Sequence, residues 1–360
     1  MNIFKTLSWN FNFNDIDLIK QVNKTNISLA NLNFIISTLR DPQVLIEFIT
    51  IKEWVKSNEI ENIHTTIIDA FISEIIEERF ISPENKETLN YKEAILVWLK
   101  DLKKYWWIWI NTIIKINEII TWNTQGIYSS PDKKIIKWTW QNMEVIYIPP
   151  QGIDNINKLL RNFEEYYNNF NEEKEIDPLL KLPLLHYQFE AIHPFGDWNW
   201  RTGRILIVLY FVLYWKLHYP ILFISDYISK NKSEYYKYLR LLDKEKEKKI
   251  KDFTLWLLKW IEQCAIETEQ IVYNIKLLQE KYIKKMKEDK TLKKIFSDEM
   301  IDYLFIRPIY SIEGLSKFLN IHKNTASKYL KLLKEKWIIK EYNYKNYKFF
   351  FNDEYLQLLK

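Results

Sequence analysis

Apolar residues recur at helical spacing along most of the chain. From Ile27 to Leu39 and from Thr66 to Ile76 they return every three or four positions, as on one face of an amphipathic helix. A short alternating stretch, Gln141 to Ile148, ends in Pro149-Pro150 and predicts a strand or hairpin arm. Asp177-Pro178 marks a further helix start, because Asp caps a first turn and Pro fits into it. The pattern predicts a mainly α protein with a small β element.

Changes in this pattern divide the 360 residues into four parts. We expect a helical N-terminal region over 1–100, a central block over 101–276, a Lys- and Glu-rich connecting helix over 277–299, and a C-terminal module over 300–360. Hydrophobic residues make up 47% of the chain, enough for a sizeable core.

The chain has no pattern that predicts export or a membrane span. Its longest apolar run, Ile205 to Trp215, is too short to cross a bilayer and predicts a buried helix. We see no secretory leader, and the single cysteine, Cys264, fits a reducing compartment. These features predict a cytoplasmic protein without membrane contact.

The net positive charge lies in the last part of the chain. Residues 301–360 contain 11 Lys and Arg against 6 Asp and Glu, so their net charge of +5 equals that of the whole chain. This asymmetry predicts a module that faces an anionic partner such as nucleic acid.

One polar segment, His193 to Arg204, leads directly into the apolar helix predicted from Ile205. The first amides of a helix form an anion site, and Arg201 and Arg204 add permanently charged groups suited to phosphates. Asp197 can hold Mg²⁺ against phosphates, and His193 can take a proton near neutral pH. A base, a metal ligand and phosphate clamps in one short segment predict nucleotidyl or phosphoryl transfer to a hydroxyl.

The segment resembles the signature of the Fic family, HPFx[D/E]GNGRxxR. Seven of the nine specified positions match, and the two differences are Trp198 and Trp200, each in place of Gly. Residues 186–192 and 220–236 also resemble the flanks of the family's core. The resemblance covers roughly residues 50–270.

The resemblance implies a protein adenylyltransferase that moves AMP from ATP, with Mg²⁺, to a Ser, Thr or Tyr hydroxyl of a protein target. It implies a Fic helical core in which a small β-hairpin flap, Trp138 to Ile148, binds the target's backbone as an added strand. His193 would be the general base, Asp197 would hold Mg²⁺, and Phe195 would anchor the loop in the core. The implied nucleotide-binding residues are Asn199, Arg201 and the backbone of Trp198 and Trp200 at the α- and β-phosphates, Arg204 at the γ-phosphate, and Tyr236 at the adenine.

Tryptophan stands where glycine would be natural. Glycine occurs 5 times, against about 25 at an average usage of about 7%, whereas tryptophan occurs 15 times. Trp215 and Trp337 follow predicted helices, at exits that favour a left-handed residue. We hypothesise that the source reads UGA as glycine. The alternative is a tryptophan-rich protein with unusual turns, in which indoles at 198 and 200 would obstruct ATP.

A second, shorter resemblance lies upstream. Ser57-Asn58-Glu59-Ile60-Glu61-Asn62 matches the [S/T]xxxE[G/N] pattern that marks an inhibitory helix in many Fic proteins. It implies that Glu61 pairs with Arg204, with Ser57 and Asn62 completing the motif. The alternative is a solvated carboxylate on an ordinary helix.

The C-terminal module resembles a winged helix-turn-helix, an α+β fold. We expect helices over 312–319 and 324–333 and wing strands over 337–340 and 347–351. The second helix would present five polar side chains to DNA: Lys323, Asn324, Ser327, Lys328 and Lys331. The alternative is a protein-interaction or dimerisation module of the same fold.

Two other functions stay open. The chain could be a Fic enzyme that transfers a different phosphate-containing group, or a non-catalytic DNA-binding regulator with a degenerate Fic core. The target protein, the DNA site and the oligomeric state, a homodimer included, are not decided by the sequence. The other histidines are expected to be structural or at the surface: His64, His186, His218 and His322.

Overall fold

A computed structural model describes residues 13–39, 41–60, 66–73, 83–124, 126–128, 136–137, 145–169, 176–244, 248–344 and 347–358. The chain divides into two compact units, which are described separately. The first comprises Met1–Ala30, Asn90–Pro220 and Tyr227–Cys264, and the second comprises Asn31–Leu89, Ile221–Asp226 and Ala265–Lys360.

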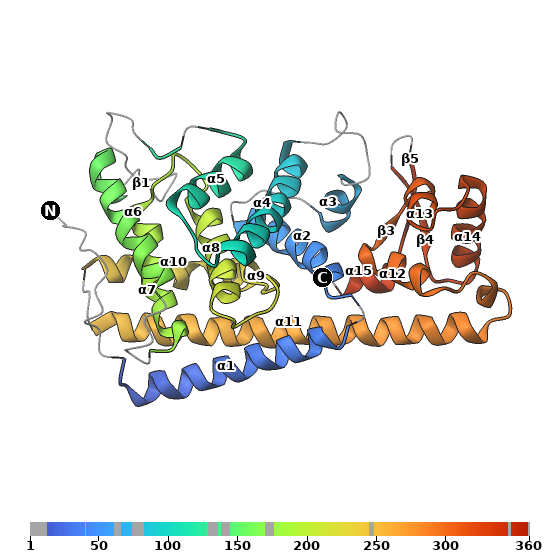
Figure 1. Cartoon of the computed structure of the whole chain (residues 1–360), viewed down its shortest axis with the longest axis horizontal. Coiled ribbons are helices and arrows are strands. Elements are labelled where there is room, and N and C mark those ends of the chain that lie inside the picture. The colour runs from blue at the N-terminus through green and yellow to red at the C-terminus, as the bar shows by residue number, and fades with distance from the viewer. Residues whose placement is uncertain are drawn as a thin grey trace. The chain divides into compact units, whose positions relative to one another are not determined.

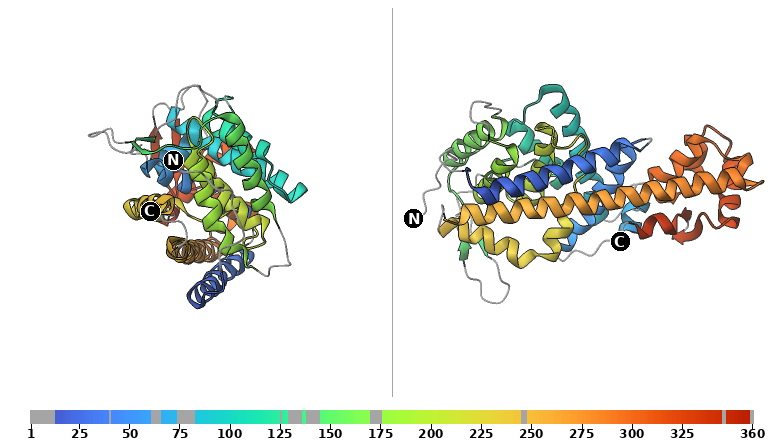
Figure 2. Two further views of the ribbon diagram at one scale, coloured as in Figure 1. Left: turned by 90° about the vertical axis from the view of Figure 1, so that its left-hand side faces the viewer. Right: turned by 90° about the horizontal axis from the view of Figure 1, so that it is seen from below.

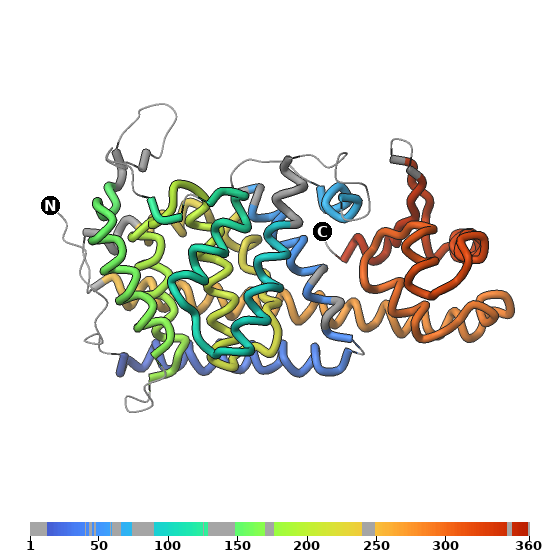
Figure 3. Tube along the Cα trace, turned by 45° about the horizontal axis from the view of Figure 1, so that its top comes forward, coloured from blue at the N-terminus to red at the C-terminus, as the bar shows by residue number. Residues whose placement is uncertain are grey.

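The first unit is built around two buried helices, α7 (Pro178–Ile192) and α8 (Asn199–Leu213). Further helices of this unit are α4 (Pro83–Tyr105, in large part), α5 (Ile110–Thr121), α6 (Ile153–Asn168) and α10 (Lys232–Lys244). α7 packs against α6 and α8, and α8 also packs against α5 (Figures 1 and 3). Every residue of α8 except Trp200 is buried, as is typical of a helix enclosed on all sides.

The start of α7 confirms the predicted cap. Asp177 Oδ1 accepts a hydrogen bond from the N–H of Leu179 at 2.9 Å, and Pro178 occupies the first turn. The other carboxylate oxygen of Asp177 lies 2.9 Å from Lys216 Nζ, just beyond the end of α8. One side chain therefore both begins α7 and ties it to the exit of the neighbouring helix.

Two long helices pass from one unit into the other, α1 (Ile16–Ser37) and α11 (Lys248–Glu288). Within the first unit they run side by side (Figure 2). Thr25 Oγ1 donates to the Leu258 carbonyl at 3.1 Å, and Gln21 Nε2 donates to Glu262 at 2.5 Å. α11 continues unbroken through residues 276 and 277, where a separate connecting helix was expected to begin.

The expected hairpin is present in part. β1 (Ile136–Lys137) and β2 (Val145–Tyr147) pair antiparallel, with Ile136 opposite Tyr147. The remainder of the predicted flap, residues 138–144, lies outside the described residues.

The second unit contains α2 (Gln43–Ile60), α3 (Ile67–Ser73) and the C-terminal module. The module consists of α12 (Asp298–Ile306), β3 (Ile309–Tyr310), α13 (Ile312–Phe318), α14 (Lys323–Glu335), β4 (Lys340–Tyr344), β5 (Tyr347–Phe351) and α15 (Asp353–Gln357). The strands form an antiparallel sheet in the order β3-β5-β4, and α13 packs against α14. Both predicted helices are confirmed. The first predicted strand starts later than expected, because Trp337 belongs to the exit of α14 and the ladder begins only at Lys340.

Five tryptophans in the described residues adopt left-handed backbone conformations, with φ between 51° and 61°: Trp106, Trp122, Trp198, Trp215 and Trp337. At the end of α14 the N–H of Trp337 donates to the Lys334 carbonyl and that of Ile338 to the Leu333 carbonyl, each at 3.0 Å. This is the hydrogen-bond pattern of a helix exit that usually contains glycine. The prediction of left-handed exits at Trp215 and Trp337 is confirmed.

The long apolar run that begins at Ile205 forms most of the buried helix α8, as expected. Across the described ranges, no helix combines the length and the low polarity needed to cross a bilayer. Cys264 is buried in α11.

Candidate functional site

A tight loop connects α7 to α8 and carries the motif. His193 ends α7 in a left-handed conformation, with φ 49°, and its N–H donates to the Phe189 carbonyl at 3.1 Å. Its side chain is half-buried, whereas Phe195 is buried as the resemblance implied. The candidate base therefore sits at a helix exit, two residues from a ring anchored in the core.

Asn199 holds this loop closed. Its Oδ1 accepts a hydrogen bond from the N–H of Phe195 at 2.8 Å, and its Nδ2 donates to the Phe195 carbonyl at 2.9 Å. Because both bonds are buried, they fix the distance between His193 and the start of α8. In the structure Asn199 shapes the loop, and its contact with a nucleotide stays a prediction.

The two motif arginines project from the first turns of α8, and each is 1% exposed. The guanidinium carbon of Arg201 lies 3.7 Å from the centroid of the Trp198 ring, and that of Arg204 lies 4.0 Å from the Trp200 ring. These are cation–π distances. The two indoles therefore cover the guanidinium faces, and glycine at both positions would uncover them.

Asp197 is an exposed carboxylate in the loop. Its Oδ1 accepts a hydrogen bond from the N–H of Trp198 at 2.7 Å, and its Oδ2 has no hydrogen bond to the described residues. One hard oxygen ligand suits Mg²⁺, which commonly completes its shell with waters and substrate phosphates. Within the described ranges no group of three or more His, Cys, Asp or Glu gathers as a metal site. Asp197 stays the candidate ligand that the resemblance implies.

A buried hydrogen bond joins α7 to α10. His186 Nε2 lies 2.8 Å from the Tyr235 hydroxyl. Burial, assisted by the positive charge of Arg204, lowers the pKa of His186 to about 3, so the ring is neutral. Tyr236, the next residue, is half-buried, and its ring centroid lies 5.2 Å from that of Tyr235. His186 lies in the core, and its structural role and the role of Tyr236 at the adenine stay predictions.

Glu190, on α7, lies against the motif helix α8 at Gly203, although no motif residue marks it. Its Oε1 is buried without a hydrogen-bond partner, and a Cβ at Gly203 would come within 2.5 Å of this oxygen. Burial raises the pKa of Glu190 to about 8, against the opposing effect of the Arg204 guanidinium. The available signal was that His186 and Glu190 lie one turn apart on the same face of α7.

Residues far away in the sequence stabilise the loop through hydrogen bonds. Asn117 Nδ2, on α5, donates to the Asp197 carbonyl and to Thr202 Oγ1, each at 3.1 Å. The N–H of Tyr128 donates to the Pro194 carbonyl at 2.8 Å. Local sequence gave no sign of these contacts, because Asn117 is 80 and 85 positions from its partners.

The predicted inhibitory motif is described only in part. Ser57 lies in the last turn of α2 and is fully buried. Glu61 and Asn62 lie outside the described residues, as does His64, so the pairing of Glu61 with Arg204 stays a prediction. His218 and His322 are exposed, as expected.

Three family profiles match successive parts of the chain. Residues 107–211 match the Fic/DOC family, residues 19–97 match the Fic/DOC family N-terminal region, and residues 278–355 match the C-terminal domain of SoFic-like protein adenylyltransferases. Together with the loop geometry, these matches show that the chain belongs to the Fic/DOC family.

Known proteins agree with this assignment. The protein adenylyltransferase Fic of Drosophila mojavensis is 33% identical over 95 residues, which are 26% of this chain and only 17% of that protein. A Fic family protein from Desulfovibrio desulfuricans has a TM-score of 0.55 at 16% identity, covering 97% of this chain and 98% of that one. A Fic domain containing signaling protein from Bacteroides thetaiotaomicron has a TM-score of 0.54 at 16% identity, covering 68% and 97%. The two solved structures show the fold.

Proposed function

We propose that the chain transfers AMP from ATP to a Ser, Thr or Tyr hydroxyl of a protein target in the cytoplasm. The α7–α8 segment carries this proposal: a half-buried imidazole ends one helix, an exposed carboxylate follows in the loop, and two buried arginines begin the next helix. The name of the curated relative, protein adenylyltransferase, supports the same activity.

In the proposed reaction, His193 accepts the proton of the target hydroxyl, whose oxygen attacks the α-phosphorus of ATP. The bond between the α- and β-phosphates breaks, and pyrophosphate leaves. Arg201 and the first amides of α8 bind the α- and β-phosphates, Arg204 binds the γ-phosphate, and Tyr236 borders the adenine. Asp197 would hold Mg²⁺, which supplies positive charge against the phosphates.

The reaction requires open space beside the arginines. Indoles at 198 and 200 lie over both guanidinium groups, so AMP transfer depends on glycine at these positions. Genuine tryptophans would favour a non-catalytic regulator with a degenerate core. The combination of Asp197, Asn199 and Arg204 favours AMP over another phosphate-containing group.

The proposed enzyme is inhibited by its own Glu61. In this scheme the Glu61 carboxylate binds Arg204 and displaces the γ-phosphate, so that ATP enters with its α-phosphate out of line for attack. Ser57, buried in the last turn of α2, supports the helix end that leads to Glu61.

Labelling with ATP tests the activity. In the enzyme carrying W198G and W200G, ATP labelled on the α-phosphate should label protein, whereas ATP labelled on the γ-phosphate should not. His193→Ala should reduce labelling by about 10²–10⁴-fold, because the hydroxyl loses its positioned base. His218→Ala, at an exposed histidine of the same unit, is the matched control. Unchanged labelling in His193→Ala would contradict the proposal.

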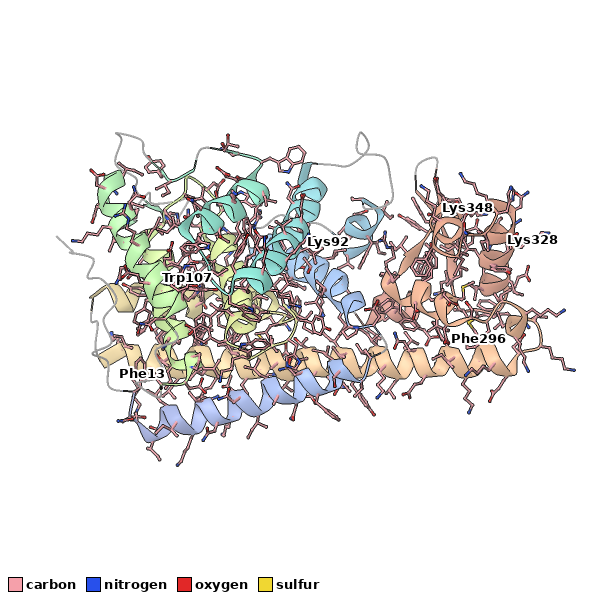
Figure 4. The ribbon with its side chains drawn as sticks, viewed as in Figure 1. Phe13, Lys92, Trp107, Phe296, Lys328 and Lys348 are labelled. Atoms are coloured by element: carbon pink, nitrogen blue, oxygen red, sulfur yellow. The ribbon has the colours of Figure 1, made fainter. Side chains whose placement is uncertain are left out.

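A second function, DNA binding by the C-terminal module, is favoured by the surface of α14. Ala326, Leu330 and Leu333 are buried on one side of this helix, and Lys328 and Lys331 are exposed on the other. Figure 4 shows Lys328 at the outer edge of α14. Neither lysine has a carboxylate within ion-pair distance among the described residues, so both are available to phosphates.

A further inference from the structure

A buried amide on α5 is bonded to both the motif loop and the motif helix. Asn117 lies where α5 packs against α8 (Figure 1), and its side chain is 7% exposed. Its Nδ2 donates to the Asp197 carbonyl and to Thr202 Oγ1, each at 3.1 Å. A side-chain amide has two N–H donors, so these two bonds use both of them. All three residues belong to the first unit.

Thr202 extends this hydrogen-bonded chain. Its hydroxyl is buried and donates to the Trp198 carbonyl at 3.1 Å. Two successive carbonyls of the loop, those of residues 197 and 198, therefore each accept a hydrogen bond from a side chain. Residue 198 has a left-handed backbone, with φ 61°. Glycine at this position would let the preceding peptide unit rotate more freely, so the bond from Asn117 matters most in a glycine-containing loop.

The peptide unit between residues 197 and 198 is held on both of its edges. A trans peptide unit is planar, so its C=O and its N–H point in opposite directions. The C=O accepts the bond from Asn117, and the N–H, which belongs to Trp198, donates to Asp197 Oδ1 at 2.7 Å. Rotation of this peptide unit would withdraw the N–H from the carboxylate. The bond from Asn117 therefore also fixes the exposed carboxylate on the other side of the peptide unit.

We infer that Asn117 is a positioning residue for Asp197: by holding the Asp197 carbonyl, it keeps the N–H of residue 198 on Oδ1 and leaves Oδ2 for Mg²⁺. This inference rests on the proposed function, in which Asp197 holds the metal ion that accompanies ATP. Residues that orient a metal ligand commonly contribute about 10–100-fold to metal affinity. Asn117 would act through the backbone of Asp197, without touching the nucleotide.

The test measures how Mg²⁺ affects the binding of ADP to the full chain carrying W198G and W200G. ADP lacks the γ-phosphate, so its binding does not depend on a contact between that phosphate and Arg204. Asn117→Leu removes both donors and keeps an apolar side chain of similar size. The Mg²⁺ concentration that gives half of the metal's effect on ADP affinity should rise by at least about tenfold. The ADP affinity in EDTA should change little, because the metal ligand has no role there.

Two further variants separate positioning from a general loss of structure. Asn117→Leu should add nothing to the effect of Asp197→Asn, because both changes act on one metal contact. Asn111→Leu makes the same change at an exposed position of α5 and should leave the Mg²⁺ requirement unchanged. If Asn117→Leu does not fold, Asn117→Ala, which also removes both donors, is measured in its place.

Hydrogen exchange without ADP or Mg²⁺ provides a readout apart from the metal. Asn117→Leu should increase exchange across residues 194–199 and leave residues 205–213 of α8 protected. An unchanged Mg²⁺ requirement, or an equal loss of ADP affinity with and without Mg²⁺, overturns the inference and leaves the proposed function intact. If Asp197→Asn does not alter the Mg²⁺ requirement, the proposed metal ligand is wrong, and this inference with it.

Discussion

Tryptophan in a left-handed conformation carries a steric cost that glycine avoids. The Cβ atom crowds the following carbonyl, at about 1–2 kcal/mol per residue. At Trp215 and Trp337 burial does not offset this cost, because the side chains are 65% and 83% exposed. The same conformation occurs at Trp198, where the Fic signature has glycine. The backbone thus supports the hypothesis that the source reads UGA as glycine, and the gene's codons decide it: UGG at these positions would exclude it.

A stability measurement tests the same point on the protein. Trp337→Gly should raise the free energy of unfolding by about 1 kcal/mol, because it removes the strain and little buried surface. Chemical denaturation of the full chain measures this change. The control is Trp260→Gly, at a buried position inside α11, which should lower stability by at least about 3 kcal/mol. Destabilisation at Trp337 as well would mean that an indole is required at this helix exit.

Among the elements, the contact between α7 and α8 combines close approach with a buried acid. Gly203 leaves room on α8 for the Glu190 carboxyl of α7, and a side chain there would meet Oε1 at 2.5 Å. The same contact places Glu190 near Arg204, although burial has the larger effect on its pKa. Burial in this contact favours the protonated form of Glu190.

The raised pKa of Glu190 predicts a pH dependence of stability. The pKa of Glu190 is about 8 in the folded chain and about 4.3 in an unfolded one. Because the folded pKa is raised, its stabilising effect is fully present below about pH 4 and is lost as the pH rises through about 8. In Glu190→Gln, the free energy of unfolding should therefore fall less between about pH 5 and about pH 8 than in the parent chain.

Denaturation curves across this pH range measure the effect. Glu165→Gln, which changes an exposed carboxylate on α6, should keep the pH dependence of the parent chain. If the curves of Glu190→Gln and the parent stay parallel, the buried acid is ionised at neutral pH and the packing argument is wrong.

At the scale of the whole molecule, charge is distributed unevenly along the chain. Residues 301–360 account for the full net charge of +5. Several lysines of the C-terminal module are paired with carboxylates, as Lys334 and Lys348 are with Glu341. Lys328 and Lys331 of α14 are exposed and have no such carboxylate partner in the described residues. These two lysines are the ones that would contact phosphates.

DNA binding by this surface should depend strongly on salt. Each phosphate contact releases counterions, so Lys328→Ala with Lys331→Ala should reduce the slope of log K against log salt by about 2. Fluorescence anisotropy of the full chain with a labelled random-sequence duplex measures this slope. Lys290→Ala with Lys293→Ala removes the same charge from exposed positions outside α14 and should leave it unchanged. If both double variants reduce the slope equally, or if the chain does not bind the duplex at low salt, a protein-interaction module is favoured.

The sequence predicted the elements whose signals are local. The cap at Asp177, the helices 312–319 and 324–333 and the exits at Trp215 and Trp337 depend on neighbouring residues, and the structure confirms them. The first wing strand was misplaced because the apolar pair Ile338-Ile339 resembles a strand, whereas in the structure both are buried before the ladder begins. The connecting helix was set off from α11 by composition alone, although charged residues continue a helix as readily as apolar ones.

By itself, the sequence determined which chemical groups the motif contains: a base, an acid and two arginines within twelve residues. Only the tertiary structure decided how these groups are held: Asn117 reaches the loop from α5, and Glu190 and Gly203 meet between α7 and α8. It alone attached α2 to Ser225 through Glu53. Such contacts join residues far apart in the chain, and their strength comes from burial, which no local pattern of residues encodes.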